Sequence, residues 1–198
     1  MIDKGNIYMS KKEIERLLVE SGAFLEGHFK LTSGKHSKYY VEKIKLIQRP
    51  EDVVKIGKAF AAKCAHLDFD VVVSPALGAI VLGYEVAKLM GKRFVFTQRK
   101  DGKMSIRSGF DLQPNEKVLI IEDVTTTGGS VFEVIDCIKE RGVDIVGVGL
   151  VVDRSGGTID FGMPVFPLLT LKIEAYEPDE CPLCREKVPI TKPGSSGK

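Results

Sequence analysis

Two adjacent acids, Glu122 and Asp123, separate an apolar run from a cluster of threonines and glycines in VLIIEDVTTTGGS, residues 118–130. The apolar run predicts a buried strand, with both acids just beyond its carboxyl end. The cluster predicts backbone N–H groups at the N-terminus of a helix, which favour a bound phosphate monoester. Carboxylates suit the hydroxyl groups of a sugar, or a divalent metal, at one sugar's length from that phosphate. The stretch therefore predicts a binding site for a ribose 5-phosphate.

A simpler interpretation is that Asp123 and Ser130 only cap the following helix. We favour the phosphate site because the acids, the hydroxyls and the glycines occur together. Two other phosphate-binding loops are excluded, since the chain contains no G-x-x-x-x-G-K-[ST] and the glycines of this stretch do not form G-x-G-x-x-G.

The rest of the chain predicts the elements that position this stretch. Apolar runs indicate strands over 70–74, 93–98, 117–121, 144–152 and 165–173, and helical periodicity covers 80–90, ended by Gly91, and 130–142, ended by Gly142. This alternation predicts an α/β fold, with a central, mostly parallel sheet covered by helices on both faces. Such sheets bind ligands at the carboxyl ends of their strands, where the two acids are expected.

Shorter elements are expected before this alternating region, as a small N-terminal hood of helix and short strands. Ser10 and Glu13 form a capping box for a helix that runs to about Gly22, and segment 29–41 predicts a short hairpin. Pro50 should begin a further helix that ends before Asp68. We expect a single domain over 1–190, with a hood to about residue 45, a core over 46–174, a C-terminal extension over 175–190 and a disordered tail over 191–198.

Bulk properties exclude several classes of protein. A chain of 198 residues that is 43% hydrophobic can bury one sizeable core. Its 29 basic and 27 acidic residues leave a net charge of +2, without the polybasic character of nucleic-acid binders. The apolar runs fall short of the roughly 18 residues that cross a bilayer, and the first residues lack the apolar core of a signal peptide. We expect a cytoplasmic protein that binds neither nucleic acid nor membranes.

Five stretches resemble the type I phosphoribosyltransferases and, more narrowly, the orotate phosphoribosyltransferases. VLIIEDVTTTGGS is similar to the family's signature for phosphoribosyl pyrophosphate (PRPP), and the other stretches are FKLTSGKHSKYY, SPALGAIVLGYEVAKLMG, FTQRKDGKMSIRSGF and VVDRSGG. The resemblance implies transfer of ribose 5-phosphate from PRPP to N1 of orotate, giving orotidine 5'-monophosphate and pyrophosphate in pyrimidine biosynthesis, with Mg²⁺ as cofactor. It also implies a type I phosphoribosyltransferase-like fold.

The resemblance implies a set of PRPP-binding residues in three segments. They are Glu122, Asp123, Val124, Thr125, Thr126, Thr127, Gly128, Gly129 and Ser130 of the signature, Ala76, Leu77 and Gly78 of the turn SPALGA, and Arg99, Lys100 and Lys103 of the segment 99–109. The exposed amides of the turn suit pyrophosphate, although a plain tight turn would read the same. Mg²⁺ is expected to bind through PRPP, with Glu122 and Asp123 as candidate protein ligands.

Segment 99–109 is polar and rich in cations, which by composition alone indicates a solvated mobile loop. In the family its cations close over the departing pyrophosphate, often in the neighbouring subunit's site, which implies a homodimer. The implied catalytic residues are Arg99, Lys100, Lys103 and Asp123, and we expect Lys103 to contribute most to the chemical step, by stabilising the leaving group.

Arg154, Thr126 and Tyr40 are the candidate contacts to orotate. The planar donors of Arg154 suit the carboxylate or carbonyl edge of this base. The alternatives are an ion pair from Arg154 to Asp153 or Asp160 and a purely structural role for Tyr40 in the core.

Three cations of well-known bacterial members are missing, at Thr32, Gly78 and Ser105. Lys35, His36, Lys43 and Arg107 are the candidates to replace them.

The pair Cys181 and Cys184 forms one C-x-x-C, which is half of a zinc knuckle. The histidines His28, His36 and His66 show no paired ligand spacing, so an ordered thiol turn is the simpler expectation, with a metal shared across a dimer as the alternative.

Three rival functions use the same sugar site. The first is a phosphoribosyltransferase for another base, such as uracil or a purine, which would not need the cation Arg154. The second is a non-catalytic PRPP-binding regulator, which would be expected to lose the cations Lys100 and Lys103 and to gain a basic surface. The third is a phosphate-binding scaffold without turnover.

Overall fold

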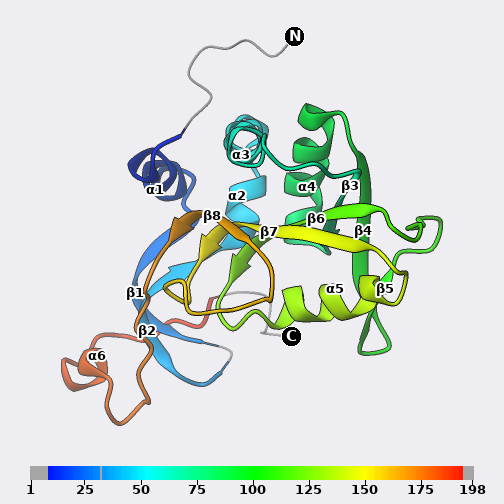
Figure 1. Cartoon of the computed structure of the whole chain (residues 1–198). Helices are drawn as coiled ribbons and strands as arrows, with labels where there is room; N and C mark the ends of the chain where they lie inside the picture. Colours follow the sequence, from blue (N-terminus) through cyan, green and yellow to red (C-terminus); the bar gives the residue numbers. More distant parts are fainter. Residues whose placement is uncertain (1–8, 32, 194–198) are drawn as a thin grey trace.

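A six-stranded sheet forms the centre of the chain in a computed structural model that describes residues 9–31 and 33–193 (Figure 1). The strand order is β5-β4-β3-β6-β7-β8. The strands are β3 (Val71–Pro75), β4 (Arg93–Lys100), β5 (Lys103–Ile106), β6 (Lys117–Thr125), β7 (Asp144–Asp153) and β8 (Val165–Thr170). All neighbours pair in parallel except β4 and β5, which are antiparallel. The predicted α/β fold with a mostly parallel sheet is confirmed.

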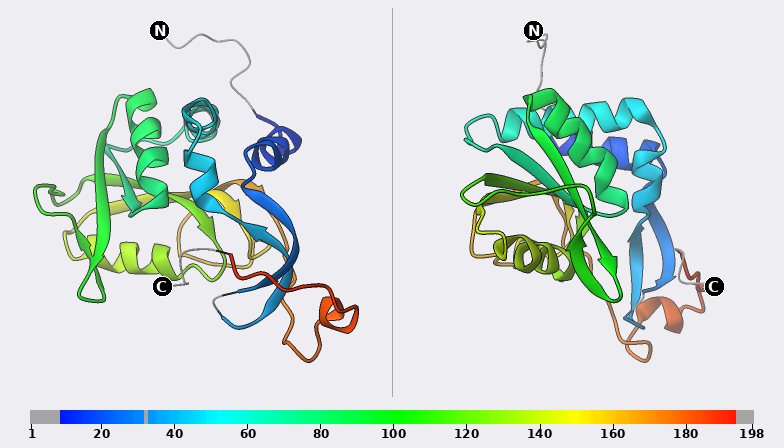
Figure 2. Two further views of the ribbon diagram at one scale, coloured as in Figure 1. Left: turned by 180° about the vertical axis from the view of Figure 1, so that it is seen from behind. Right: turned by 90° about the vertical axis from the view of Figure 1, so that its right-hand side faces the viewer.

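Helices cover both faces of this sheet (Figures 1 and 2). One face carries α1 (Lys11–Glu20), α3 (Pro50–Lys63) and α4 (Gly78–Met90), whose apolar sides share a buried cluster with Leu119 and Ile121 of β6. The other face carries α5 (Gly129–Lys139), which packs on the second buried cluster. Helix α4 ends at Gly91, as predicted, but α5 ends three residues before the predicted Gly142, because the N–H of Gly142 donates to Lys139 O in a separate turn.

The hood lies beside the sheet and contains the predicted helix and hairpin. The capping box is present, with Ser10 Oγ accepting from the N–H of Glu13 and the Glu13 carboxylate accepting from the N–H of Ser10. Strands β1 (Phe24–Lys30) and β2 (His36–Val41) form an antiparallel pair that begins earlier than the predicted residue 29. A short helix, α2 (Lys43–Ile47), follows β2 and was not predicted.

The C-terminal extension, residues 175–190, returns to the hairpin of the hood (Figure 1). It contains the short helix α6 (Pro182–Arg185), which was not predicted. Thr191, expected in the tail, instead pairs with the hairpin. Its N–H donates to His28 O, and its carbonyl accepts from the N–H of Lys30. Residues 194–198 of the expected tail lie outside the described residues.

Segment 99–109 was predicted as an irregular loop, and this is wrong for residues 99–106, which form most of a hairpin. Residues Lys100 and Lys103 instead face each other in the β4–β5 hairpin, whose turn is Asp101-Gly102. Both turn residues have positive φ, 53° and 80°, as the tight turns of hairpins require. The Asp-Gly pair is a recognised hairpin signal that the charge of the segment obscured.

Within the described residues, the helices are too short or too polar to cross a membrane.

Candidate active site

The two acids of the signature lie inside β6 and not beyond it, because the strand continues to Thr125. Glu122 is buried, and its carboxylate accepts hydrogen bonds from Ser130 Oγ at 2.7 Å and from the N–H of Asp123 at 2.9 Å. Burial and the neighbouring Asp123 raise the pKa of Glu122 to about 8. With a pKa near 8, Glu122 is mostly protonated at neutral pH.

Asp123 presents the one unsatisfied oxygen of the pair. Its Oδ1 accepts from the N–H of Val124 at 2.6 Å, whereas its Oδ2 is buried and has no hydrogen-bond partner in the described part of the chain. Lys43 Nζ lies 3.6 Å from this oxygen, at the limit of an ion pair. A buried carboxylate oxygen left in this state is a strong acceptor that suits a hydroxyl group or a divalent metal.

Gly78 lies directly against this oxygen. A Cβ built on Gly78 would stand 1.9 Å from Asp123 Oδ2, and the Cδ of Lys43 would be 3.5 Å away. A side chain at position 78 would require the Asp123 carboxylate to move, so the cation that well-known bacterial members carry there does not fit this arrangement of Asp123. The aliphatic stem of Lys43 occupies the adjoining space.

Lys43 is accordingly the replacement candidate that the structure brings to the site. Lys35 forms a surface ion pair with Glu177 at 2.9 Å, and His36 lies against His28 and Cys184. Arg107 is exposed on the hairpin of β4 and β5. Ser105 donates its hydroxyl to Gln98 O, and Thr32 lies outside the described residues.

The loop after β6 is the predicted phosphate-binding segment. The side chains of Thr126 and Thr127 are exposed, and Gly128 is the N-cap of α5 with a φ of 83°. The simpler interpretation of the acids as helix caps is wrong, because α5 receives no side-chain cap and Ser130 binds Glu122 instead. The first amides of α5 lack intrahelical acceptors and are available to an anion.

Three PRPP candidates are less available than expected. The side chain of Thr125 is buried and its carbonyl accepts from the N–H of Arg154. The N–H of Val124 is bound to Asp123, and the N–H of Ala76 donates to Thr97 O at 2.7 Å. In the turn before α4, Leu77 is 75% exposed, and Gly78 begins the helix. Of these three residues only Leu77 is exposed, because Gly78 is buried and the N–H of Ala76 is already bound.

The three candidate catalytic cations of the β4–β5 hairpin divide into one paired and two free side chains among the described residues. Arg99 forms two hydrogen bonds to the carboxylate of Glu133 on α5, at 2.8 and 3.0 Å, and this contact raises the pKa of Arg99. Lys100 and Lys103 are exposed next to the turn, and neither forms an ion pair within the described residues. The hairpin thus holds Arg99 beside α5 and carries the two lysines at its outer end.

Arg154 follows β7 and is partly buried, with its Nε enclosed by the protein. Its Nε finds no hydrogen-bond acceptor in the described part of the chain, and burial lowers the pKa of Arg154. The alternative ion pairs are wrong, because Asp153 accepts from Ser155 and Gly157 and Asp160 accepts from the N–H of Gly162. A buried cation without an acid partner indicates a place for an anionic ligand.

Tyr40 is near enough to Arg154 for each to affect the ionisation of the other. Burial raises the pKa of Tyr40, and the phenol in turn opposes the lowering of the pKa of Arg154. The ring of Tyr40 packs against Phe29 with 5.7 Å between centroids. Strand β2 thus brings an aromatic face to the region of the buried cation.

Ionisation of Glu122 should make the stability of the ligand-free protein depend on pH. The folded state holds the Glu122 proton up to about pH 8, whereas an ordinary glutamate loses it near 4.5, so the free energy of unfolding falls as pH rises between these values. In Glu122→Gln this group cannot ionise. Between pH 5 and pH 8 the free energy of unfolding should therefore fall further in the parent than in the variant. We expect a difference between the two falls of at least about 1 kcal/mol, a threshold set below the free energy of a single pKa unit.

Denaturant unfolding at several pH values measures this difference. Glu15→Gln, at an exposed position of α1, is the matched control and should follow the parent. Parallel pH profiles of the parent and Glu122→Gln would contradict the assigned ionisation.

Comparison with known proteins identifies the family. A family model described as "Phosphoribosyl transferase domain" matches residues 45–177. An "Orotate phosphoribosyltransferase" of Desulforamulus reducens is 47% identical over 187 residues, covering 94% of this chain and 98% of the relative. Another of that name, from Caldicellulosiruptor bescii, is 48% identical over 190 residues, covering 96% of this chain and 100% of the relative.

Solved structures agree on the fold. The orotate phosphoribosyltransferase of Mycobacterium tuberculosis in complex with inorganic phosphate superposes with a TM-score of 0.67 at 24% identity, covering 81% of this chain and 95% of that one. The enzyme of that name from Aeropyrum pernix gives a TM-score of 0.68 at 22% identity, covering 80% and 94%. With its type I phosphoribosyltransferase fold and this level of identity, the chain belongs to the orotate phosphoribosyltransferases, within the phosphoribosyl transferase domain family.

Proposed function

We propose that this chain transfers ribose 5-phosphate from PRPP to N1 of orotate, which releases pyrophosphate and forms orotidine 5'-monophosphate in pyrimidine biosynthesis. The relatives named above support this pentosyltransferase activity. The structural observation that carries it is the partly buried Arg154, whose Nε is buried and has no acceptor among the described residues. Orotate brings a carboxylate that would pair with this cation. Uracil and the purines bring no such charge, so the site favours orotate over the alternative bases.

We place the sugar of PRPP over Glu122 and Asp123. The free oxygen of Asp123 would accept one of the 2- and 3-hydroxyls, and the ionised Glu122 would support the other. The 5-phosphate would bind the amides and hydroxyls of residues 126–130 at the start of α5. Pyrophosphate would then lie toward Leu77, Gly78 and Lys43.

Mg²⁺ fits this arrangement, because the unpartnered oxygen of Asp123 is the hard donor that Mg²⁺ prefers. Glu122 and Asp123 are the residues that would hold it, together with oxygens of PRPP. When bound, the ion supplies positive charge that offsets the charge of the pyrophosphate.

Catalysis depends on stabilising the leaving group. Breaking the bond between C1 of ribose and pyrophosphate leaves positive charge on the ring and negative charge on the departing oxygens. We assign Arg99, Lys100 and Lys103 to those oxygens, with Lys103 as the main stabiliser or proton donor. A regulator without turnover has no need of these lysines, and their retention favours an enzyme.

The hairpin of β4 and β5 is proposed to act across a homodimer. Its lysines stand at the outer end, away from any acid partner within the described residues. The neighbouring surface is apolar, with Tyr84 58% exposed and Phe110 38% exposed beside Phe94 and Phe96. Such a patch suits a contact between two copies, which would bring each hairpin to the partner's sugar site.

We infer a cytoplasmic location from the thiols, since all four cysteines are free and the reducing cytoplasm keeps them so.

Arg154→Leu tests the assignment to orotate. The parent should consume orotate in an ultraviolet assay with PRPP and Mg²⁺ and leave uracil, hypoxanthine and adenine unchanged. In the variant we expect kcat/KM for orotate to fall by about 10- to 100-fold, the value of one lost charged hydrogen bond, and PRPP affinity to stay within about threefold. Arg141→Leu, at an exposed position after α5, is the control. Turnover of another base in preference to orotate by the parent would overturn the proposed function.

Lys43→Ala tests the replacement of the missing cation. We expect the Kd of PRPP with Mg²⁺ to rise about tenfold, or about 1.4 kcal/mol, because a cation beside Asp123 and the proposed pyrophosphate position is lost. Titration calorimetry measures the affinity. Lys45→Ala, two residues along the same helix and exposed, is the matched control. Equal effects of both changes would show that only general charge is involved.

Lys103→Ala tests the leaving-group assignment. We expect kcat to fall at least tenfold with the melting temperature unchanged, because the side chain is exposed and unpaired within the described residues. Lys58→Ala, exposed on α3, serves as the control. A kcat within about threefold of the parent's, less than 1 kcal/mol of barrier, would contradict this role.

Mixing two impaired variants tests whether the hairpin acts across subunits. In a mixed dimer of Lys103→Ala and Arg154→Leu, one site has both native residues only if Lys103 comes from the partner subunit. Activity well above that of either variant alone is therefore expected after exchange of subunits, and no recovery means that each hairpin serves its own chain.

A further inference from the structure

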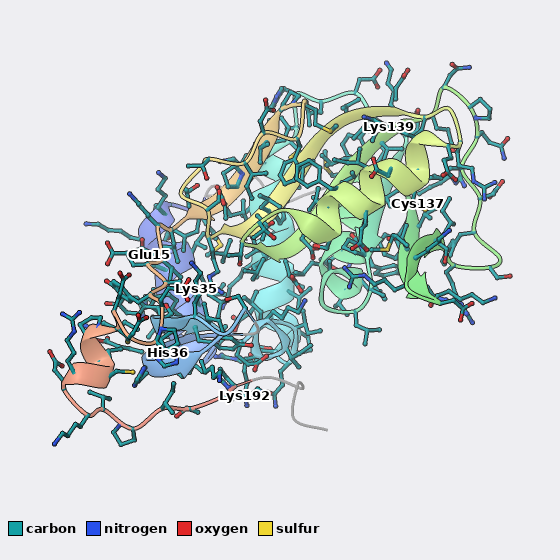
Figure 3. The ribbon with its side chains drawn as sticks, turned by 90° about the horizontal axis from the view of Figure 1, so that it is seen from below. Glu15, Lys35, His36, Cys137, Lys139 and Lys192 are labelled. Atoms are coloured by element: carbon teal, nitrogen blue, oxygen red, sulfur yellow. The ribbon has the colours of Figure 1, made fainter. Side chains whose placement is uncertain are left out.

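Four metal-binding side chains meet where the C-terminal extension crosses the hood. His28 comes from β1, and His36 begins β2. Cys181 is the N-cap of α6, and Cys184 lies within this helix. The four potential ligand atoms all lie within 4.8 Å of one another. Figure 3 shows His36 on the hairpin beside the extension, on the side of the molecule away from α5.

Distances between these atoms match a tetrahedral zinc site. His28 Nε2 is 3.1 Å from His36 Nδ1, and His36 Nδ1 is 3.2 Å from Cys184 Sγ. His28 Nε2 is 3.6 Å from Cys181 Sγ and 3.8 Å from Cys184 Sγ. Zinc bonds of ~2.0 Å to nitrogen and ~2.3 Å to sulfur imply separations of about 3.3 Å between two nitrogens and about 3.6 Å between nitrogen and sulfur.

The surroundings of His28 fix its ring in the orientation that a metal needs. His28 Nδ1 lies 2.8 Å from Val188 O, and only a protonated nitrogen can donate to a carbonyl. With Nδ1 as the donor, the lone pair of a neutral His28 ring lies on Nε2, the atom that faces His36 and the two cysteines. Histidines that bind zinc usually donate the N–H of their other ring nitrogen to a carbonyl or carboxylate in this way.

The backbone holds the four residues in place on both sides of the cluster. His36 and Tyr176 exchange two hydrogen bonds of 2.8 Å before it, and Thr191 pairs with the other strand of the hairpin after it. His28, His36 and Cys181 are buried, whereas α6 itself buries no side chain of its four residues. Few apolar side chains are thus buried where the extension turns, and the buried side chains there are potential metal ligands.

We propose that His28, His36, Cys181 and Cys184 bind one structural Zn²⁺ within each chain. Four protein ligands complete a closed tetrahedral site, which leaves no position for substrate and separates this metal from the Mg²⁺ of the sugar site. The ion ties the C-terminal extension to the hairpin of the hood. It does not require a second subunit, in contrast to the shared site considered from the sequence.

The spacing of the histidines concealed this site. The antiparallel register places Lys30 opposite His36 and Phe29 opposite Ser37, so His28 and His36 come together across the hairpin although eight residues separate them. His66, the third histidine, packs against Phe166 elsewhere and takes no part.

Metal content of the purified chain is the first test. After reconstitution with Zn²⁺ and removal of loose metal, mass spectrometry should find about one zinc per chain in the parent. The double variant Cys181→Ser with Cys184→Ser, and the single variant His28→Gln, should retain less than about 0.2. The matched controls Cys137→Ser and His66→Gln should keep the full amount, since Cys137 lies on α5, away from His36 (Figure 3).

Measurements on the unaltered chain keep the test decisive if a variant fails to fold. Co²⁺ in place of Zn²⁺ should give the strong visible absorption of a tetrahedral site with thiolate ligands. With zinc bound, two cysteines should fail to react with a thiol reagent, and they should react once a chelator has removed the metal. The same chelator should lower the melting temperature by several degrees.

Three results would overturn the proposal. They are a parent that takes up less than about 0.2 zinc per chain, variants that keep as much zinc as the parent, and a disulfide between Cys181 and Cys184 in protein purified under reducing conditions. None of these outcomes depends on turnover of orotate, so the metal site and the proposed function can fail independently.

Discussion

The buried pair Glu122 and Asp123 is the constraint from which the rest of the site follows. Side chains alternate along a strand, so the two neighbours leave β6 on opposite faces of the sheet. Glu122 reaches Ser130 at the start of α5, and Asp123 reaches Gly78 at the start of α4. One dipeptide therefore contacts two helix N-termini, and in the proposed function the amides of both termini would bind PRPP.

Contact between Asp123 and Gly78 also bears on the cation that well-known bacterial members carry at position 78. A side chain at this position would require the Asp123 carboxylate to move, whereas a cation from another element can approach that carboxylate without such a shift. Helix α2 supplies Lys43 there directly after β2 supplies Tyr40. The hood thus contributes to the proposed site directly. Lys43 brings a cation to the proposed pyrophosphate position, and Tyr40 brings an aromatic ring to the proposed base position.

Local periodicity made the central fold predictable, and long-range pairing limited the rest. Apolar runs such as 70–74 and 117–121 locate buried strands because their patterns depend on near neighbours. The hairpin over 99–109 was missed because its cations outweighed the turn signal of Asp101-Gly102. The pairing of Arg154 with Asp153 or Asp160 could not be excluded from sequence, since it depends on which donors reach those acids. The cluster of His28, His36, Cys181 and Cys184 depends on strand register and on the return of a segment about 150 residues away.

Strand β2 connects the two sites of the molecule. His36 stands at its start within the metal cluster, and Tyr40 stands near its end beside Arg154, four residues or roughly 13 Å further along. The hairpin has little core of its own at the metal end, where Phe29 is the buried apolar side chain. A bound ion there would hold the start of β2 at a fixed position on the extension. Because a strand is stiff over so short a length, fixing its start also restricts the position of Tyr40 relative to the sheet that carries Arg154.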